Sequence, residues 1–272
     1  KLTAFLAGIV ACSSFSTIAS ADTSNVKVMT RNIFLGTDWI APLVWLNPLP
    51  GGVPTSAAAI ATTYEHARLL RNDYQARMEA IADEILEQQP DIIALQEVAK
   101  FFTQSPSDML GDYRISEPVD ATELIIDFLP VLQAALETRG LAYTVIGKQK
   151  DANSELPMAN FNKETGLFEE GYTDIRLETY NVTLVKQGTS VGEVVDEVTF
   201  DEEINIDFAI ADPDLKSYRG YVAADITVDG MEYRFVNAHL EVYTNNFLAT
   251  LGANLSQYQR KQMDKLIETF ED

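Results

Sequence analysis

The segment from Arg77 to Glu97 constrains the fold more than any other part of the chain. It contains an amphipathic helix that Pro90 ends and, directly after it, the continuous apolar run 92–95. Such a run is typical of a strand buried on both faces, which needs helices or a second sheet to cover it. The sequence therefore predicts an α/β fold. The apolar helix face is made of residues that recur at helical spacing, namely Met78, Ile81, Ala82, Ile85 and Leu86.

The rest of the chain alternates further strands with helices. Asp229-Gly230 is a two-residue hairpin signal between two strand patterns and indicates antiparallel pairing. A second helix is expected to run from Leu124 to a stop signal at Arg139-Gly140, and a third over 256–270. The remaining predicted strands cover 26–33, 143–147, 181–186, 221–228 and 231–240.

The composition is that of a globular protein with a sizeable core. Of 272 residues, 46% are hydrophobic and 22% are charged, which excludes disordered, collagen-like and coiled-coil chains. One large domain or two small ones fit this length, and no boundary is evident. The 20 basic residues against 41 acidic ones give a net charge of −21, which argues against bulk attraction to nucleic acid or anionic lipid. A bound metal ion can still supply the positive charge that a phosphate ester needs.

Two further features are expected to be structural only. Residues 193–214 contain nine acidic residues and no lysine or arginine, without the spacing of a calcium loop, so we expect a solvated loop there. His66 lies in a helical pattern and is expected on the solvated face of that helix.

Residues 1–21 have the layout of a secretory signal peptide. Lys1 precedes the apolar run 2–11, and Ala19-Ser20-Ala21 matches an A-x-A cleavage site. The residues around Cys12 also resemble a bacterial lipobox, so lipidation at Cys12 is the alternative to cleavage after residue 21. We expect a secreted or periplasmic protein, free or tethered as a lipoprotein. No transmembrane segment is expected, because no run approaches the ~20 apolar residues that spanning requires.

Polar residues stand where three predicted strands end. Asn32 ends the first strand, Gln96-Glu97 follow the buried strand, and Asn237 and His239 lie in the return strand of the hairpin. Singly they have structural explanations: a turn cap for Asn32, a surface ion pair for Glu97 and a core histidine for His239. Their order along the chain and the residues next to them favour a shared functional site.

The sequence around these residues resembles the endonuclease/exonuclease/phosphatase superfamily. The carrying motifs are Thr30-Arg31-Asn32-Ile33, Pro90 to Val98 with its L-Q-E, Phe235 to Leu240 with its N-x-H, and Arg219-Gly220-Tyr221. The resemblance covers about residues 26–272 and implies a DNase I-like four-layer sandwich, two packed mixed sheets flanked by helices. It makes residues 22–272 one partial domain of that superfamily.

The resemblance also assigns roles to individual residues. It implies that Glu97 and Asn32 hold a divalent metal ion, usually magnesium, a cation bound in proteins by one or two carboxylates together with substrate phosphates. His239 and Asn237 would be the catalytic residues, His239 stabilising or protonating the phosphoryl group. Arg219 and Asn181 would contact the substrate, although a salt bridge to an acidic residue is an equal alternative for Arg219.

The superfamily pattern also contains a G-D-x-N and an S-D-H motif, and neither occurs in the 272 residues. We therefore expect a sequence that stops before the second half of the active site and begins just inside the true start, and a chain that is inactive by itself. For the complete protein we expect a monomeric, secreted, Mg²⁺-dependent phosphoesterase. Its substrate is a phospholipid head group, an inositol phosphate or nucleic acid. The alternative is a non-catalytic secreted binding protein on the same scaffold.

Overall fold

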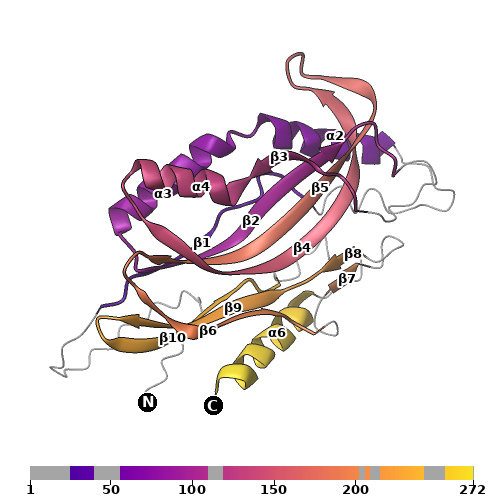
Figure 1. The fold of residues 1–272 in the computed structure, drawn as a ribbon. Helices are drawn as coiled ribbons and strands as arrows, with labels where there is room; N and C mark the ends of the chain where they lie inside the picture. Colours follow the sequence, from indigo (N-terminus) through magenta and orange to yellow (C-terminus); the bar gives the residue numbers. More distant parts are fainter. Residues whose placement is uncertain are drawn as a thin grey trace.

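Two β-sheets lie face to face, and helices cover their outer sides (Figure 1). The computed structural model describes residues 25–39, 56–109, 119–201, 206–208, 215–241 and 255–271. The expected signal peptide and Cys12 lie outside these residues. In the described part the layers run helices, large sheet, small sheet, helix, so the expected two-sheet α/β sandwich is confirmed. Among the described residues, no helix combines the length and the apolar character needed to cross a membrane.

The larger sheet has the strand order β1-β2-β5-β4, with β3 also paired to β2. Strand β1 runs parallel to β2, so that Asn32 at its end lies opposite Gln96, and the other pairs are antiparallel. Helices α2 and α3 form the crossover between β1 and β2. The bounds are β1 Val28–Asn32, α2 Ser56–Arg71, α3 Tyr74–Gln88, β2 Ile92–Gln104, β3 Glu123–Asp127, α4 Phe128–Thr138, β4 Tyr143–Asn162 and β5 Leu167–Lys186.

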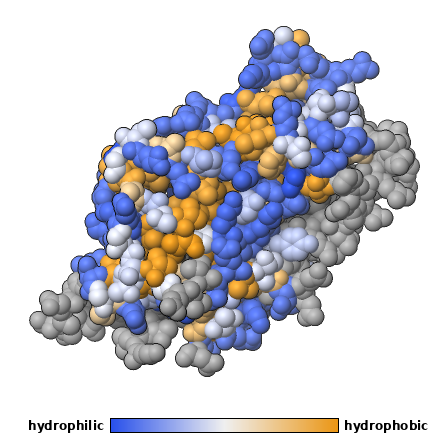
Figure 2. Space-filling view, viewed as in Figure 1, coloured by the Kyte–Doolittle hydropathy of each residue, from blue (hydrophilic) through white to orange (hydrophobic). Residues whose placement is uncertain are grey.

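The main apolar core lies between the larger sheet and its helices. Most of the apolar face predicted for the helix before Pro90 is buried there on α3, where Met78 and Ile85 have no exposed surface. Leu86, predicted on the same face, is 42% exposed. Phe101 of β2 and Phe128 of α4 complete this core, with ring centroids 6.2 Å apart. On the outer side, Figure 2 shows an apolar band along α4 and β3, where Leu124 is exposed.

The smaller sheet has the order β10-β9-β6 and packs on α6. Its hairpin turns at Asp229 and Gly230, both with positive φ, as the Asp-Gly signal predicted. Along β10, Val236 and Ala238 face α6, and Phe235 faces the larger sheet. The bounds are β6 Ser190–Thr199, β7 Ile206–Phe208, β8 Leu215–Ser217, β9 Gly220–Val228, β10 Met231–Ala238 and α6 Leu255–Phe270, with β7 and β8 forming a two-stranded ribbon.

Three expectations were wrong. The segment before Phe128 is strand β3 rather than helix, because Asp127 caps α4 by accepting a hydrogen bond from Leu129 N at 3.2 Å. Residues 193–199 belong to strand β6 rather than to a loop, because they pair with β9. His66 is buried on α2 and lies 3.0 Å from Ala159 O through Nδ1, and burial lowers its pKa.

Candidate functional site

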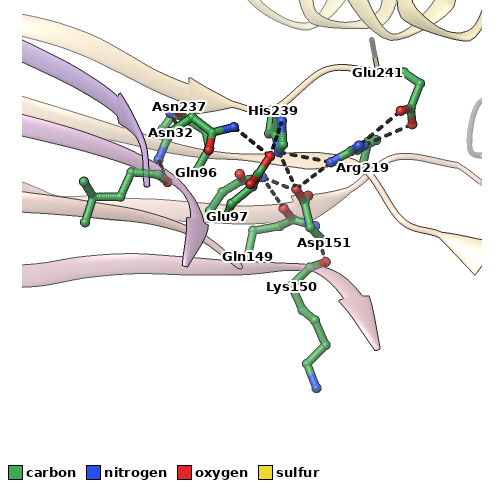
Figure 3. A network of polar contacts seen from close by, with 12 residues as sticks. Asn32, Gln96, Glu97, Gln149, Lys150, Asp151, Arg219, Asn237, His239 and Glu241 are labelled. Atoms are coloured by element: carbon green, nitrogen blue, oxygen red, sulfur yellow. Dashed lines mark hydrogen bonds and ion pairs between the residues drawn. The ribbon is translucent and has the colours of Figure 1, made fainter. Parts of the chain in front are cut away.

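The three polar strand ends meet at one end of the space between the two sheets (Figure 3). Asn32 ends β1, Glu97 lies in β2, and His239 directly follows β10. The amide of Asn32 donates from Nδ2 to Glu97 Oε1 at 2.8 Å, and His239 Nε2 lies 4.0 Å from the same oxygen. Residues from three separate parts of the sequence therefore converge around one carboxylate.

Glu97 owes its position to a β-bulge. Between the pairs Leu95↔Val182 and Val98↔Tyr180, β2 carries two residues where β5 carries one. Glu97 has φ 58°, a left-handed conformation that is uncommon for a residue with a side chain. Bulges of this kind redirect a side chain and are frequent beside active sites. Glu97 Oε2 accepts a hydrogen bond from Leu35 N at 3.1 Å, and 23% of the side chain is exposed.

His239 is held on its other side by a buried ion-pair network. Its Nδ1 lies 3.1 Å from Asp151 Oδ2 and 3.0 Å from Arg219 Nη1. Arg219 also pairs with Asp151 at 3.1 Å and with both carboxylate oxygens of Glu241 at 3.1 Å. Burial alone lowers the pKa of Arg219, but the charges of Asp151 and Glu241 outweigh it and raise that pKa, which keeps the guanidinium charged.

These two neighbours control the proton on His239. A guanidinium only donates and an ionised carboxylate only accepts, so Nδ1 bonds one of them at a time. When Nδ1 accepts from Arg219, the ring proton of a neutral His239 is on Nε2, which can then donate to a phosphate oxygen. When Nδ1 donates to Asp151, the Nε2 of a neutral ring is an acceptor. The network thus prepares His239 for hydrogen bonding or proton transfer at Nε2, the atom nearer to Glu97.

Asn181 supports Asp151 from β5. Its Nδ2 donates to Asp151 Oδ1 at 2.9 Å and to Gln149 Oε1 at 2.7 Å. The side chain is fully buried, and its Oδ1 is an acceptor without a hydrogen-bond partner among the described residues. The structure therefore places Asn181 behind the Asp151–His239 pair.

Asn237 joins the two sheets rather than lying open to solvent. It is 1% exposed, accepts from Gln96 Nε2 at 2.8 Å and donates to Val182 O at 3.0 Å. Weaker bonds reach Leu95 O and Thr183 Oγ1 at 3.3 Å. Asn237 thus fixes Gln96, the residue before Glu97.

The Arg-Gly-Tyr motif has a steric explanation. A Cβ atom on Gly220 would lie 2.1 Å from Val198 O and 2.6 Å from Gln149 Nε2, so only glycine fits between β6 and β4. This close approach sets Arg219 beside Asp151. Sequence reasoning identified Arg219 and missed its partners Asp151 and Glu241, which nothing in the local pattern distinguishes from the other acidic residues.

The donor set can be compared with the needs of a divalent cation. Within the described ranges, no three His, Cys, Asp or Glu side chains are grouped closely enough to hold a metal ion. Magnesium needs fewer, since it keeps several waters and takes one or two carboxylates with substrate phosphate oxygens. The carboxylate of Glu97 fits such a site. Asn32 turns Nδ2 toward this carboxylate and would contribute through Oδ1, which accepts one bond from Phe34 N and keeps a second lone pair.

No protein-family model and no curated protein matches the sequence. Among solved structures, an endonuclease/exonuclease/phosphatase family protein from Leptotrichia buccalis has TM-score 0.36 and 14% identity, covering 82% of this chain and 57% of its own. An endonuclease/exonuclease/phosphatase from Beutenbergia cavernae has TM-score 0.41 and 17% identity, and the match covers 89% of this chain and 43% of that structure. Humanized D. rerio TDP2 has TM-score 0.38 and 11% identity, and the match covers 91% of this chain and 60% of that structure. The chain thus spans 43% to 60% of the length of these structures, and at such identities and TM-scores the likeness carries no argument about its activity.

Proposed function

We propose that this chain belongs to the endonuclease/exonuclease/phosphatase superfamily and carries the metal and phosphate site of a secreted, divalent-metal-dependent phosphoesterase. One observation carries the proposal: Asn32, Glu97 and His239, which the motifs assign to one site, converge at one end of the sheets. Because their sequence positions are far apart, a chance pattern of three polar residues would have no reason to meet.

Each residue has a task in this proposal. Glu97 and Asn32 would hold Mg²⁺, which when bound neutralises charge that develops on the phosphoryl group. His239 would bind a phosphoryl oxygen through Nε2. Arg219 and Asp151 would position His239 by bonding its Nδ1, and Asn181 would support Asp151. Asn237 would position Glu97 by bonding Gln96.

The alternative is a non-catalytic binding protein on the same scaffold. It is favoured by the absence of G-D-x-N and S-D-H from the 272 residues, since these motifs are expected to supply the base that activates water. The gene sequence after codon 272 separates the two proposals. G-D-x-N followed by S-D-H supports the enzyme, and a stop codon supports the binding protein.

The activity test compares the complete gene product with Glu97→Gln on bis-p-nitrophenyl phosphate, with Mg²⁺ and then with EDTA. We expect EDTA to abolish hydrolysis and Glu97→Gln to reduce it about 100-fold or more, because one ligand charge is lost. Glu232→Gln, an exposed glutamate of the β9–β10 hairpin, is the matched control and should hydrolyse normally. Normal turnover by Glu97→Gln, or with EDTA, would refute the metal assignment.

A further inference from the structure

Phe34 is the one exposed aromatic residue in the described loop 33–39, which follows β1. It lies two residues after Asn32, and its side chain is 49% exposed although it is large and apolar. Its φ is 62°, in the left-handed region that favours glycine. For a bulky residue this conformation is strained and persists only where surrounding contacts impose it.

The contacts that impose it also tie Phe34 to the site. Its own N–H donates to Asn32 Oδ1 at 2.9 Å, and the next N–H, of Leu35, donates to Glu97 Oε2 at 3.1 Å. The carbonyl of Phe34 accepts from Arg77 Nη1 at 2.7 Å. The backbone of Phe34 is therefore fixed to both proposed metal-site residues, which keeps this residue beside the site.

The rest of the loop is held by hydrogen bonds with Glu65 of α2 and with Asn72, which lies between α2 and α3. Asn72 Nδ2 donates to Gly36 O at 3.0 Å, and the buried carboxylate of Glu65 accepts from Thr37 Oγ1 at 2.8 Å and from Asp38 N at 2.6 Å. These anchors explain how the strain is maintained. They do not explain why an apolar ring is held half in solvent, where it gains little from burial.

We infer that Phe34 is a stacking surface for an aromatic ring, such as a nucleobase, carried by the phosphate ester. The guanidinium of Arg77 lies over the ring, 5.4 Å from its centroid, so a cation already covers one face of the ring. Base–aromatic stacking is sequence-tolerant and needs only an exposed ring held at a fixed place. Phe34 determines substrate choice in this account and takes no part in the chemistry.

A nucleobase fits the surroundings better than a lipid chain. Polar side chains border Phe34: Asn32 and Arg77 bond its backbone, and Arg77 also lies over its ring. A hydrocarbon chain would instead need a continuous apolar surface. The net charge of −21 further favours a nucleotide-sized substrate over a long polyanion. The inference rests on the proposed function, because the ring acts only if a phosphate binds beside it.

The test uses AMP and ribose 5-phosphate, which differ only by the base, with binding followed by ³¹P NMR in the presence of Mg²⁺. The wild-type protein should bind AMP about tenfold more tightly than ribose 5-phosphate. In Phe34→Gly and Phe34→Leu this ratio should fall to about one, and in Phe34→Tyr it should persist, because a tyrosine ring also stacks. Phe168→Ala removes a similarly exposed phenylalanine, at 55%, from the distant β4–β5 hairpin and should leave the ratio unchanged.

Thermal melting distinguishes substrate binding from a structural role. Glycine accepts the left-handed conformation without strain, so Phe34→Gly should melt within a few degrees of wild type. A strong loss of melting temperature with an unchanged binding ratio would overturn the inference.

Hexyl phosphate tests whether the ring binds an apolar chain instead. If hexyl phosphate and AMP both bind more tightly than ribose 5-phosphate by the same factor, and Phe34→Leu keeps that factor, the inference is also overturned in favour of an apolar chain. If none of the three phosphates binds the wild type, the proposed function fails as well. Ribose 5-phosphate binding without a base effect refutes the role of Phe34 alone.

Discussion

The space between the two sheets is apolar at one end and polar at the other. At the apolar end, Ile92, Val185, Ile226 and Phe235 pack together from both sheets. Further along the same strands the inward positions carry Gln96, Asn181 and Asn237. Arg219, just before β9, and His239, just after β10, continue this polar end. The backbone is continuous through both ends, so the fold is secured where the side chains are apolar and the chemistry is placed where they are polar. The difference indicates that polar groups are tolerated in this layer where other groups of the site pair with them.

Breaking the ion-pair network should cause the largest loss in the free energy of unfolding. Arg219→Met leaves the carboxylates of Asp151 and Glu241, 1% and 5% exposed, buried without their cation. We expect the free energy of unfolding to fall by about 3–5 kcal/mol in urea denaturation. Arg234→Met, which breaks the more exposed pair with Asp225 on the same sheet, is the control and should cost about 0.2–1 kcal/mol. Equal losses in both variants would show that burial of the network is not what matters.

A cavity at the apolar end should affect stability and not the site. Ile226→Ala removes a side chain that is 1% exposed, and we expect it to lower the free energy of unfolding by about 3 kcal/mol. Mn²⁺ affinity, measured well below the unfolding transition, should remain that of wild type. A matching loss of Mn²⁺ affinity would mean that the two ends of the layer are not independent.

The bridge between the sheets should show an intermediate effect. Asn237→Ala leaves Gln96 Nε2 and Val182 O without their 2.8 Å and 3.0 Å partners, and we expect a loss of about 2 kcal/mol. Because Gln96 precedes Glu97, Mn²⁺ binding should weaken too. If stability falls and Mn²⁺ affinity does not, Asn237 supports the fold alone.

Glu155 tests whether a buried polar group without a hydrogen-bond partner lowers the stability of the protein. It lies four residues after Asp151 on β4 and is 2% exposed, and in the part of the chain that the structure describes its Oε1 has no hydrogen-bond partner. Burial raises its pKa, and the charge of Asp174 acts in the same direction. The folded state therefore binds this proton more tightly than the unfolded chain, so stability is lost as the pH rises through this pKa. We expect Glu155→Gln to stabilise the protein by about 1 kcal/mol at pH 7 and to have little effect near pH 4. A melting-temperature difference that is the same at both pH values would contradict this.

The sequence predicted the strands that carry the site better than the contacts that organise it. The buried run before Gln96 correctly predicted the start of β2. The predicted return strand correctly contained Asn237, whereas β10 ends at Ala238 and His239 directly follows it. Asp151 was missed because the β4 strand pattern fades after Gly147 and a bulge between Lys150 and Ala152 interrupts its alternation. The pairing of Arg219 with Glu241 depends on three-dimensional proximity, which periodicity does not encode. His66 was misplaced for the same reason, since the strand that buries it lies far away in the sequence.

Mn²⁺ binding by the 272-residue chain tests directly whether Glu97 holds a metal ion. It is measured by calorimetry at about 0.15 M salt, which screens weak binding to surface acids. The comparison is between wild type, Glu97→Gln and Glu232→Gln, each shown by circular dichroism to be folded. We expect one site, which Glu97→Gln weakens at least about tenfold and Glu232→Gln leaves unchanged. Equal Mn²⁺ affinity in wild type and Glu97→Gln would contradict it, because the carboxylate on which the three strand ends converge would then hold no metal.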